Sequence, residues 1–128
     1  MWYSYAILRL VPRVERGEFV NVGVVLFSRQ LDFLQTRIAL DAGRARALAP
    51  DVDLGQVERH LRAFAAIAEG DPSAGAVADL PRAERFHWLT APRSTIIQTS
   101  PVHVGRASDP RAALDELVER YVRPSSWA

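Results

Sequence analysis

Three hydrophobic segments near the start of the chain show the two-residue period of β-strands. They cover residues 2–11, 18–28 and 31–40. The middle segment is rich in β-branched residues and is apolar on both sides, which is typical of a central strand. Residues 12–17, with a proline and a glycine, predict the first turn, and residues 29–30 predict the second. The pattern therefore indicates a mostly antiparallel sheet with the segment 18–28 between the other two.

Helical spacing follows these strands. Four segments are predicted to be helices: 41–48, 53–70, 81–89 and 109–122. Asp53 and Asp109 are suited to cap their helices, because a carboxylate accepts hydrogen bonds from the free amides of the first turn. Residues 95–98 predict a fourth strand, and residues 125–128 are expected to fray. No repeat or linker interrupts the pattern, so a single domain is predicted over residues 1–128.

Alternation divides the predicted strands into two faces. One face is almost uniformly aliphatic and carries Ser4, Ala6, Leu8, Leu10, Val20, Val22, Val24, Leu26, Leu34, Thr36, Ile38 and Leu40. The two long helices, 53–70 and 109–122, need a partner for their apolar stripes, and this face is expected to supply it. The predicted fold class is α+β, with about four strands, one of them after the helices, and two or three amphipathic helices packed on one face.

The other face mixes aromatic and polar side chains. It carries Tyr3, Tyr5, Ile7, Arg9, Phe19, Asn21, Gly23, Val25, Phe27, Phe33, Gln35 and Arg37. If the turns are tight, Arg9 lies opposite or diagonal to Asn21, and Arg37 lies near Gly23. A polar belt of Arg9, Asn21 and Arg37 then crosses three strands between aromatic residues. Tyrosine, phenylalanine and arginine are enriched at interfaces, so the belt indicates a recognition surface.

A purely structural interpretation of these residues stays open. An arginine on a mixed face often packs its stem on neighbours or pairs with a carboxylate. Asn21 can satisfy a backbone group, and Gly23 can ease a bulge or a close approach. In the first turn, Arg13, Arg16 and Glu18 form either a solvated turn or an anion-binding loop. The candidate binding residues are Arg9, Arg13, Arg16, Glu18, Asn21, Gly23 and Arg37.

Composition narrows the classes of function. The chain has no cysteine, which excludes disulfides, thiolate catalysis and the usual structural zinc sites. Its basic residues are all arginine, yet its net charge is only +1, so no overall field attracts nucleic acid. His60, His87 and His103 lack metal-ligand spacing, and Glu18 has no second acid with which to share acid–base work. We expect no catalytic residue, no metal and no cofactor.

The start of the chain lacks the basic region of a signal peptide, and Arg9 interrupts its apolar run. No apolar stretch reaches the length of roughly 18 residues that suggests a membrane helix. These features predict a soluble protein in the cytoplasm.

Three parts of the chain resemble a known family. The segments Tyr-Ser-Tyr-Ala-Ile-Leu-Arg at 3–9 and Arg-Gly-Glu-Phe-Val-Asn-Val-Gly-Val-Val-Leu at 16–26 carry most of the resemblance. The pairs Ser-Pro at 100–101 and Asp-Pro at 109–110 add to it. The chain is similar to the bacterial domain-of-unknown-function family 3037. That family has no established activity, so the resemblance assigns no catalytic residue. Some of its members are encoded beside HipA-like kinases, which implies a role with a partner.

Two functional hypotheses follow. The first is a non-catalytic protein-interaction or regulatory module, with a HipA-like kinase or a second copy of the chain as partner. The alternative is a small enzyme, or a protein that binds a nucleotide or another small anion, using the mixed face and the neighbourhood of Arg9, Glu18 and Asn21. A nucleic-acid partner is disfavoured by the near-neutral charge.

Overall fold

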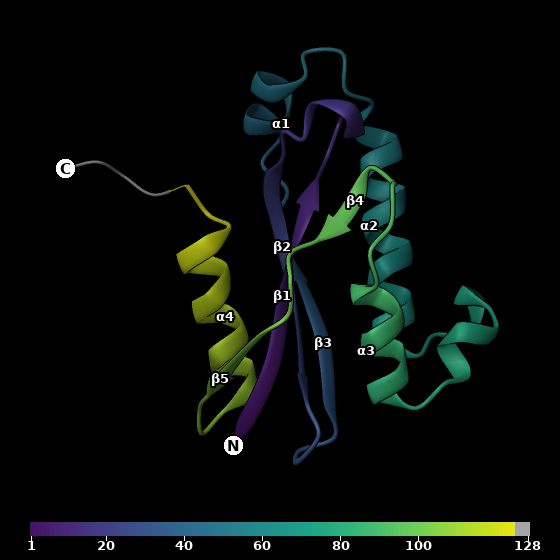
Figure 1. Cartoon of the computed structure of the whole chain (residues 1–128), viewed down its shortest axis with the longest axis vertical. Helices are drawn as coiled ribbons and strands as arrows, with labels where there is room; N and C mark the ends of the chain where they lie inside the picture. Colours follow the sequence, from purple (N-terminus) through teal and green to yellow (C-terminus); the bar gives the residue numbers. More distant parts are fainter. Residues whose placement is uncertain (125–128) are drawn as a thin grey trace.

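An antiparallel sheet lies between two layers of helices in the computed structural model, which describes residues 1–124 (Figure 1). Its strands are β1 (Trp2–Leu10), β2 (Val20–Ser28), β3 (Phe33–Ile38), β4 (Ile97–Thr99) and β5 (His103–Arg106). The order is β3-β2-β1-β4, and β5 also pairs with β1. The predicted central position of the second strand is confirmed. The predicted frayed tail, 125–128, lies outside the described residues.

One edge of β1 has two successive partners. Residues 8–10 pair with β4, and residues 2–5 pair with β5. At the break between them, the N–H groups of Ile7 and Ser100 donate at 2.9 Å to Ser100 Oγ and to the carbonyl of Ile7. The sequence predicts only the first of these two strands. The extra strand, β5, makes the sheet five-stranded.

The helices are α1 (Ala42–Leu48), α2 (Leu54–Glu69), α3 (Arg82–Thr90) and α4 (Pro110–Tyr121). Each bound lies within one or two residues of its prediction. The carboxylates of Asp41, Asp53 and Asp109 accept hydrogen bonds from first-turn amides, so the capping prediction for Asp53 and Asp109 is confirmed. Gly70 ends α2 in the left-handed conformation, with φ of 73°. None of the helices in the described residues is long and apolar enough to cross a membrane.

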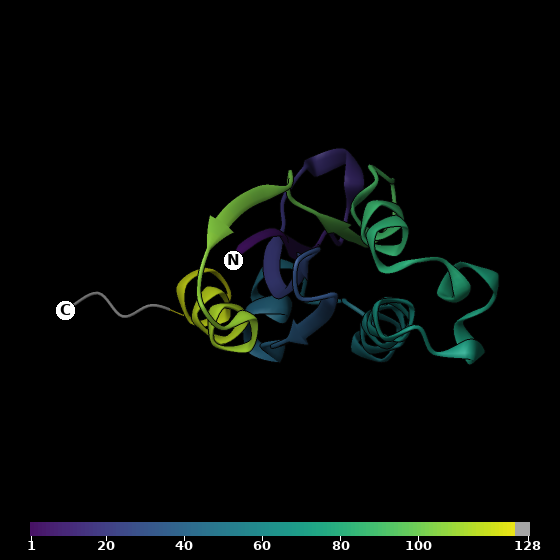
Figure 2. The same cartoon turned by 90° about the horizontal axis from the view of Figure 1, so that it is seen from below.

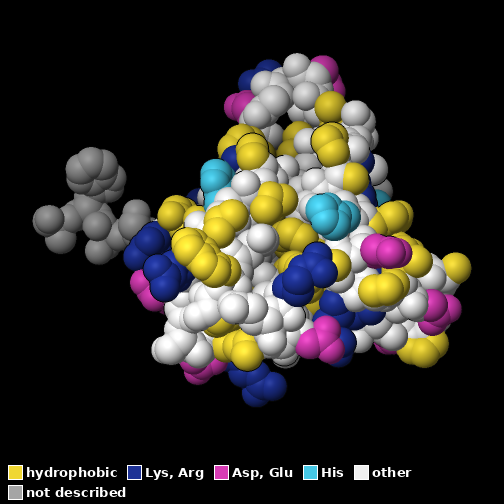
Figure 3. Space-filling model, turned by 60° about the horizontal axis from the view of Figure 1, so that its bottom comes forward, with side chains coloured by type: hydrophobic (Ala, Val, Ile, Leu, Met, Phe, Trp, Pro, Cys, Tyr) yellow, Lys and Arg dark blue, Asp and Glu magenta, His cyan; other side chains and the backbone are white. Residues whose placement is uncertain are grey.

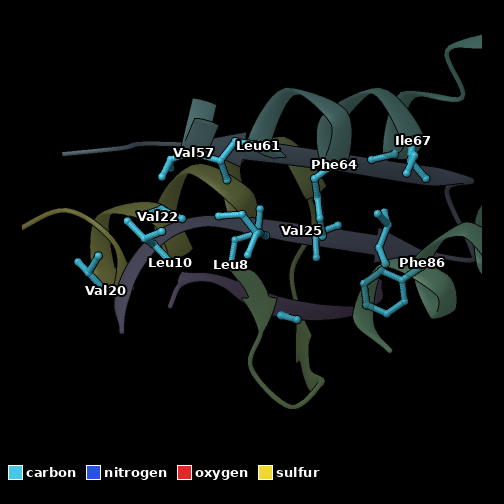
Figure 4. Packing of buried hydrophobic residues seen from close by; sticks show 14 of the residues in the cluster. Leu8, Leu10, Val20, Val22, Val25, Val57, Leu61, Phe64, Ile67 and Phe86 are labelled. Atoms are coloured by element: carbon cyan, nitrogen blue, oxygen red, sulfur yellow. The ribbon is translucent and has the colours of Figure 1, made fainter. Parts of the chain in front are cut away.

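The face of the sheet that α1, α2 and α3 cover is called the first face. Its buried sheet residues in the core are Ala6, Leu8, Leu10, Val20, Val22, Val25, Leu34 and Ile97. Figure 4 shows Leu61 and Phe64 of α2 directed at this layer, with Phe86 of α3 beside them. The stripe predicted for residues 53–70 therefore packs on an aliphatic sheet face, as expected.

The opposite, second face is covered by α4. Leu114, Leu117 and Val118 form a separate core with Ile7 and Val24. Figure 2 shows α4 on one side of the sheet and α2 and α3 on the opposite side. The α+β class is confirmed, but the prediction that the helix 109–122 shares a face with the helix 53–70 is wrong.

An irregularity in β2 explains why α4 finds an apolar surface there. Arg9 pairs with Asn21 and Leu8 pairs with Gly23, so Val22 is an extra residue with no partner on β1. A bulge of this kind shifts the alternation of all residues beyond it. As a result, Val24 and Leu26 belong to the second face, not with Val20 and Val22 as predicted. Val25 and Phe27 take their places on the first face.

Candidate functional site

The predicted polar belt is partly assembled. Arg9 and Asn21 are directly paired across β1 and β2, as the tight first turn predicts. The guanidinium of Arg9 lies over the ring of Phe19, 4.1 Å from its centroid. The side-chain amide of Asn21 donates to the carbonyl of Tyr121 at 2.9 Å, which ties β2 to the C-terminal end of α4. Arg9 Nε and Asn21 Oδ1 are buried and make no hydrogen bond to another described residue.

Arg37 does not join this pair. Arg37 lies on β3, opposite Val24 of β2. Its guanidinium binds Asp115 of α4 at 3.2 Å, and both side chains are largely exposed. Asp115 and Tyr121, the two α4 residues held by the belt, are roughly 9 Å apart along the helix axis. Gly23 marks a close approach of two strands, because a Cβ there would lie 2.8 Å from the carbonyl oxygen of Arg37.

The mixed face is therefore occupied by a segment of the same chain. Tyr5 stacks against Tyr121 of α4, with ring centroids 6.4 Å apart, and also contacts Tyr3. Burial raises the pKa of both Tyr3 and Tyr5, so both phenols stay neutral at physiological pH. The surface that the sequence predicts for recognition lies largely beneath α4.

The remaining candidates line a pocket of about 230 Å³ between the first turn and the α1–α2 connection, the first-turn pocket. Arg13 binds Asp51 at 3.3 Å, and Arg16 binds Glu18. The hydrogen bond from Arg16 holds the pKa of Glu18 below its ordinary value. Both arginines thus have a carboxylate partner, and the pocket carries no surplus of positive charge from them.

Among residues 1–124, no group of three or more histidines and carboxylates lies close enough to hold a metal ion. His60, His87 and His103 are on α2, α3 and β5.

A larger hollow, of about 540 Å³, lies at the other end of the sheet and is called the open groove. Its lining includes Trp2, Phe27, Phe86, His87, Val102 and Val104. It exists because helix cover on the first face stops at Phe86, whose ring stacks on Phe27 with centroids 5.5 Å apart. Figure 3 shows this end of the molecule, where hydrophobic side chains gather beside histidines and arginines.

Three apolar side chains of the open groove face solvent. Trp2, Val102 and Val104 are 56%, 45% and 64% exposed. Sequence reasoning missed this surface. The valines at 102 and 104 alternate with His103 and carry the period of a strand, but Pro101 masks that signal.

Comparison with known proteins gives one match. A family model described as "Protein of unknown function (DUF3037)" matches residues 5–122. The match includes β2, β5 and α4, and it confirms the resemblance drawn from the sequence motifs. No curated protein and no solved structure matches the chain.

Proposed function

We propose that this chain, which belongs to the DUF3037 family of proteins of unknown function, is a non-catalytic module that binds a partner protein through the open groove. The observation that supports this is the exposure of Trp2, Val102 and Val104 together, around a hollow of about 540 Å³. Contiguous apolar side chains beside a hollow are typical of binding surfaces, whereas single exposed apolar residues are common everywhere.

The alternative, a small enzyme or an anion-binding protein that uses the mixed face, has less support. α4 packs over that face, and Asn21 already binds its backbone. In the first-turn pocket, Arg13 and Arg16 are each paired with a carboxylate, so an anion would have to displace that carboxylate.

A HipA-like kinase is the first partner to test, together with any other protein that copurifies with the chain from its native host. The variant Val104→Glu adds a charge at an exposed groove position. Val14→Glu is its matched control, because Val14 is also an exposed valine, 46% accessible, but lies in the first turn at the other end of the sheet. Both variants are expected to melt within about 2 °C of the parent chain, as exposed substitutions usually do.

Affinity purification with quantitative mass spectrometry then separates the outcomes. The proposal predicts that a partner bound by the parent chain is retained by Val14→Glu and lost by Val104→Glu. If every copurifying protein binds Val104→Glu as well as it binds the parent chain, the open groove is not the partner site.

A further inference from the structure

β5 borders the open groove and has a free edge. β5 pairs with β1 on one side, and no other strand of the described residues pairs with it. Just beyond β5, Met1 and Ala107 exchange two backbone hydrogen bonds, at 2.7 and 3.0 Å. In an antiparallel ladder, bonded and non-bonded pairs alternate. Val104 and Arg106 are therefore in non-bonded pairs, and their N–H and C=O groups point away from β1.

The side chains of this edge belong to the groove. Val104 is opposite Ser4, and Arg106 is opposite Trp2, all on the first face of the sheet. The guanidinium of Arg106 lies 4.8 Å from the ring centroid of Trp2. A strand added beside β5 would thus find backbone donors and acceptors at its edge, and every second side chain would lie over the groove.

The charged side chains that line or border the groove are arginines. Arg29 lines it and Arg106 borders it, and neither pairs with a carboxylate among residues 1–124. The lining also contains His87 and has no aspartate or glutamate. In contrast to the balanced first-turn pocket, this surface has positive charge without a partner, which favours a segment that brings carboxylates.

A second copy of the chain fits this edge less well. β5 reads His-Val-Gly-Arg and has no acidic residue. Edge-to-edge pairing of two copies would bring two copies of Arg106 into one short interface, and like charges brought together across strands are destabilising.

We propose that the open groove binds an extended, acidic–apolar segment of a partner protein, which adds to β5 as a new edge strand of the sheet. Its apolar side chains lie against Trp2 and Val104, and its carboxylates meet Arg29 and Arg106. This assignment rests on the proposed function, since it specifies the partner of the same groove.

The probe is a library of short random peptides displayed on phage, selected on the full chain. We expect enriched peptides in which apolar and acidic residues share every second position, because side chains two residues apart on a strand lie on the same face and can reach both Val104 and Arg106. An enriched peptide is then synthesised with a fluorescent label, and its affinity is measured by anisotropy. Enrichment of no peptide, or of peptides without acidic residues, would overturn the proposal.

Val104→Pro tests the backbone contact. It removes an N–H that points away from β1, and proline is tolerated on an edge strand in that orientation. Peptide binding is expected to fall about tenfold. Val104→Thr keeps the N–H and the branched shape, so it serves as the control and is expected to bind within about threefold of the parent chain.

N-methylated versions of the peptide give a second test on the unmodified chain. Methylation of alternate amides is expected to abolish binding in one register and spare it in the other, because only alternate groups face β5. Equal binding by both registers, together with undiminished binding by Val104→Pro, would overturn strand addition. If Val104→Glu still loses the cellular partner in that case, the groove remains the partner site and only the strand assignment fails.

Discussion

Among residues 1–124, the first face of the sheet is covered by three helices, and the second by α4 alone. The first-face core is aliphatic across β1 and β2, with residues such as Leu8 and Val22 nearly or fully buried under α2. The core under α4 is narrower and has aromatic residues at its margin, Tyr3 and Tyr5 among them. Even so, Val24 and Leu114 are completely buried there. Both faces therefore contain fully buried hydrophobic residues, although the second face is covered by fewer helices than the first.

Polar residues have a definite place in this difference. On the second face they lie at the borders of α4, where Asn21 binds its last turn and Arg37 binds its middle. The apolar residues between them, Ile7, Val24 and Leu26, pack against α4. A polar belt on a sheet can therefore be the margin of a helix contact. Arg29 and Arg106, at the open groove, have no such contact with a helix and pair with no carboxylate among residues 1–124.

The largest expected effect tests whether both faces are core. Val22→Asp and Val24→Asp each place a charge where the parent side chain is 1% or less exposed, one on each face. Val22→Asp is expected to lose roughly 4 kcal/mol of unfolding free energy, because it buries a charge in an apolar core. Val24→Asp is expected to lose somewhat less, because Arg37 lies opposite it on β3 and can pair with the new carboxylate. Urea unfolding measures the loss, with Val14→Asp as the exposed control. A Val24→Asp variant as stable as the control would mean that α4 does not cover the second face.

The bulge at Val22 shows where sequence reasoning reaches its limit. Four of the five strands and the helices could be predicted, because their hydrophobic periods are visible in the sequence, and so could the pairing of Arg9 with Asn21. The face of the sheet on which the side chain of Val24 lies could not be predicted. Its neighbours are apolar in either register, and the choice depends on how closely β2 approaches β3 at Gly23.

The open groove was out of reach of sequence reasoning for a related reason. It results from the point at which α3 stops covering the first face, and from a short strand, β5, that follows a proline. Both depend on contacts between segments far apart in the chain. The candidate residues Arg13, Arg16 and Glu18 could be grouped correctly from sequence, since they share one turn.

Two cavity-forming variants, one in each core, compare how much each core contributes to stability. Leu61→Ala on α2 and Leu114→Ala on α4 remove side chains that are 2% and 0% exposed. Each is expected to cost about 3 kcal/mol, from lost burial and the cavity left behind. Calorimetry or chemical unfolding gives both values. A cost below about 0.5 kcal/mol for Leu114→Ala alone would show that α4 is only loosely attached.

Gly23→Ala tests the bulge itself. The new Cβ would lie 2.8 Å from the carbonyl oxygen of Arg37, and that backbone atom can move only if β3 moves. The expected loss is about 2 kcal/mol. Gly55→Ala in the first turn of α2 is the control, because its Cβ would meet nothing closer than 3.4 Å and alanine favours the helix by up to about 1 kcal/mol. If the two variants are equally stable, the close approach of β2 to β3 is not the reason that glycine stands at position 23.

The smallest effect is expected at the border of α4. Arg37→Met keeps the apolar stem over the sheet and removes the ion pair with Asp115, whose side chains are 45% and 63% exposed. Exposed pairs contribute little, so the loss should be below about 1 kcal/mol and should disappear in roughly 1 M salt. Arg120→Met is the control, because the ion pair of Arg120 is with Glu116 within α4 and not with a strand.

The comparison of these two arginine variants decides what the border contributes. If Arg37→Met loses no more unfolding free energy than Arg120→Met, the apolar contacts of α4 with Ile7, Val24 and Leu26 hold the helix in place. The ion pair of Arg37 then contributes little to stability. A loss well above 1 kcal/mol that persists in salt would instead make the ion pair a structural link between β3 and α4, since screening removes only exposed electrostatic contributions. Because α4 packs on Val24 and Leu26, which are completely buried, we expect the first result.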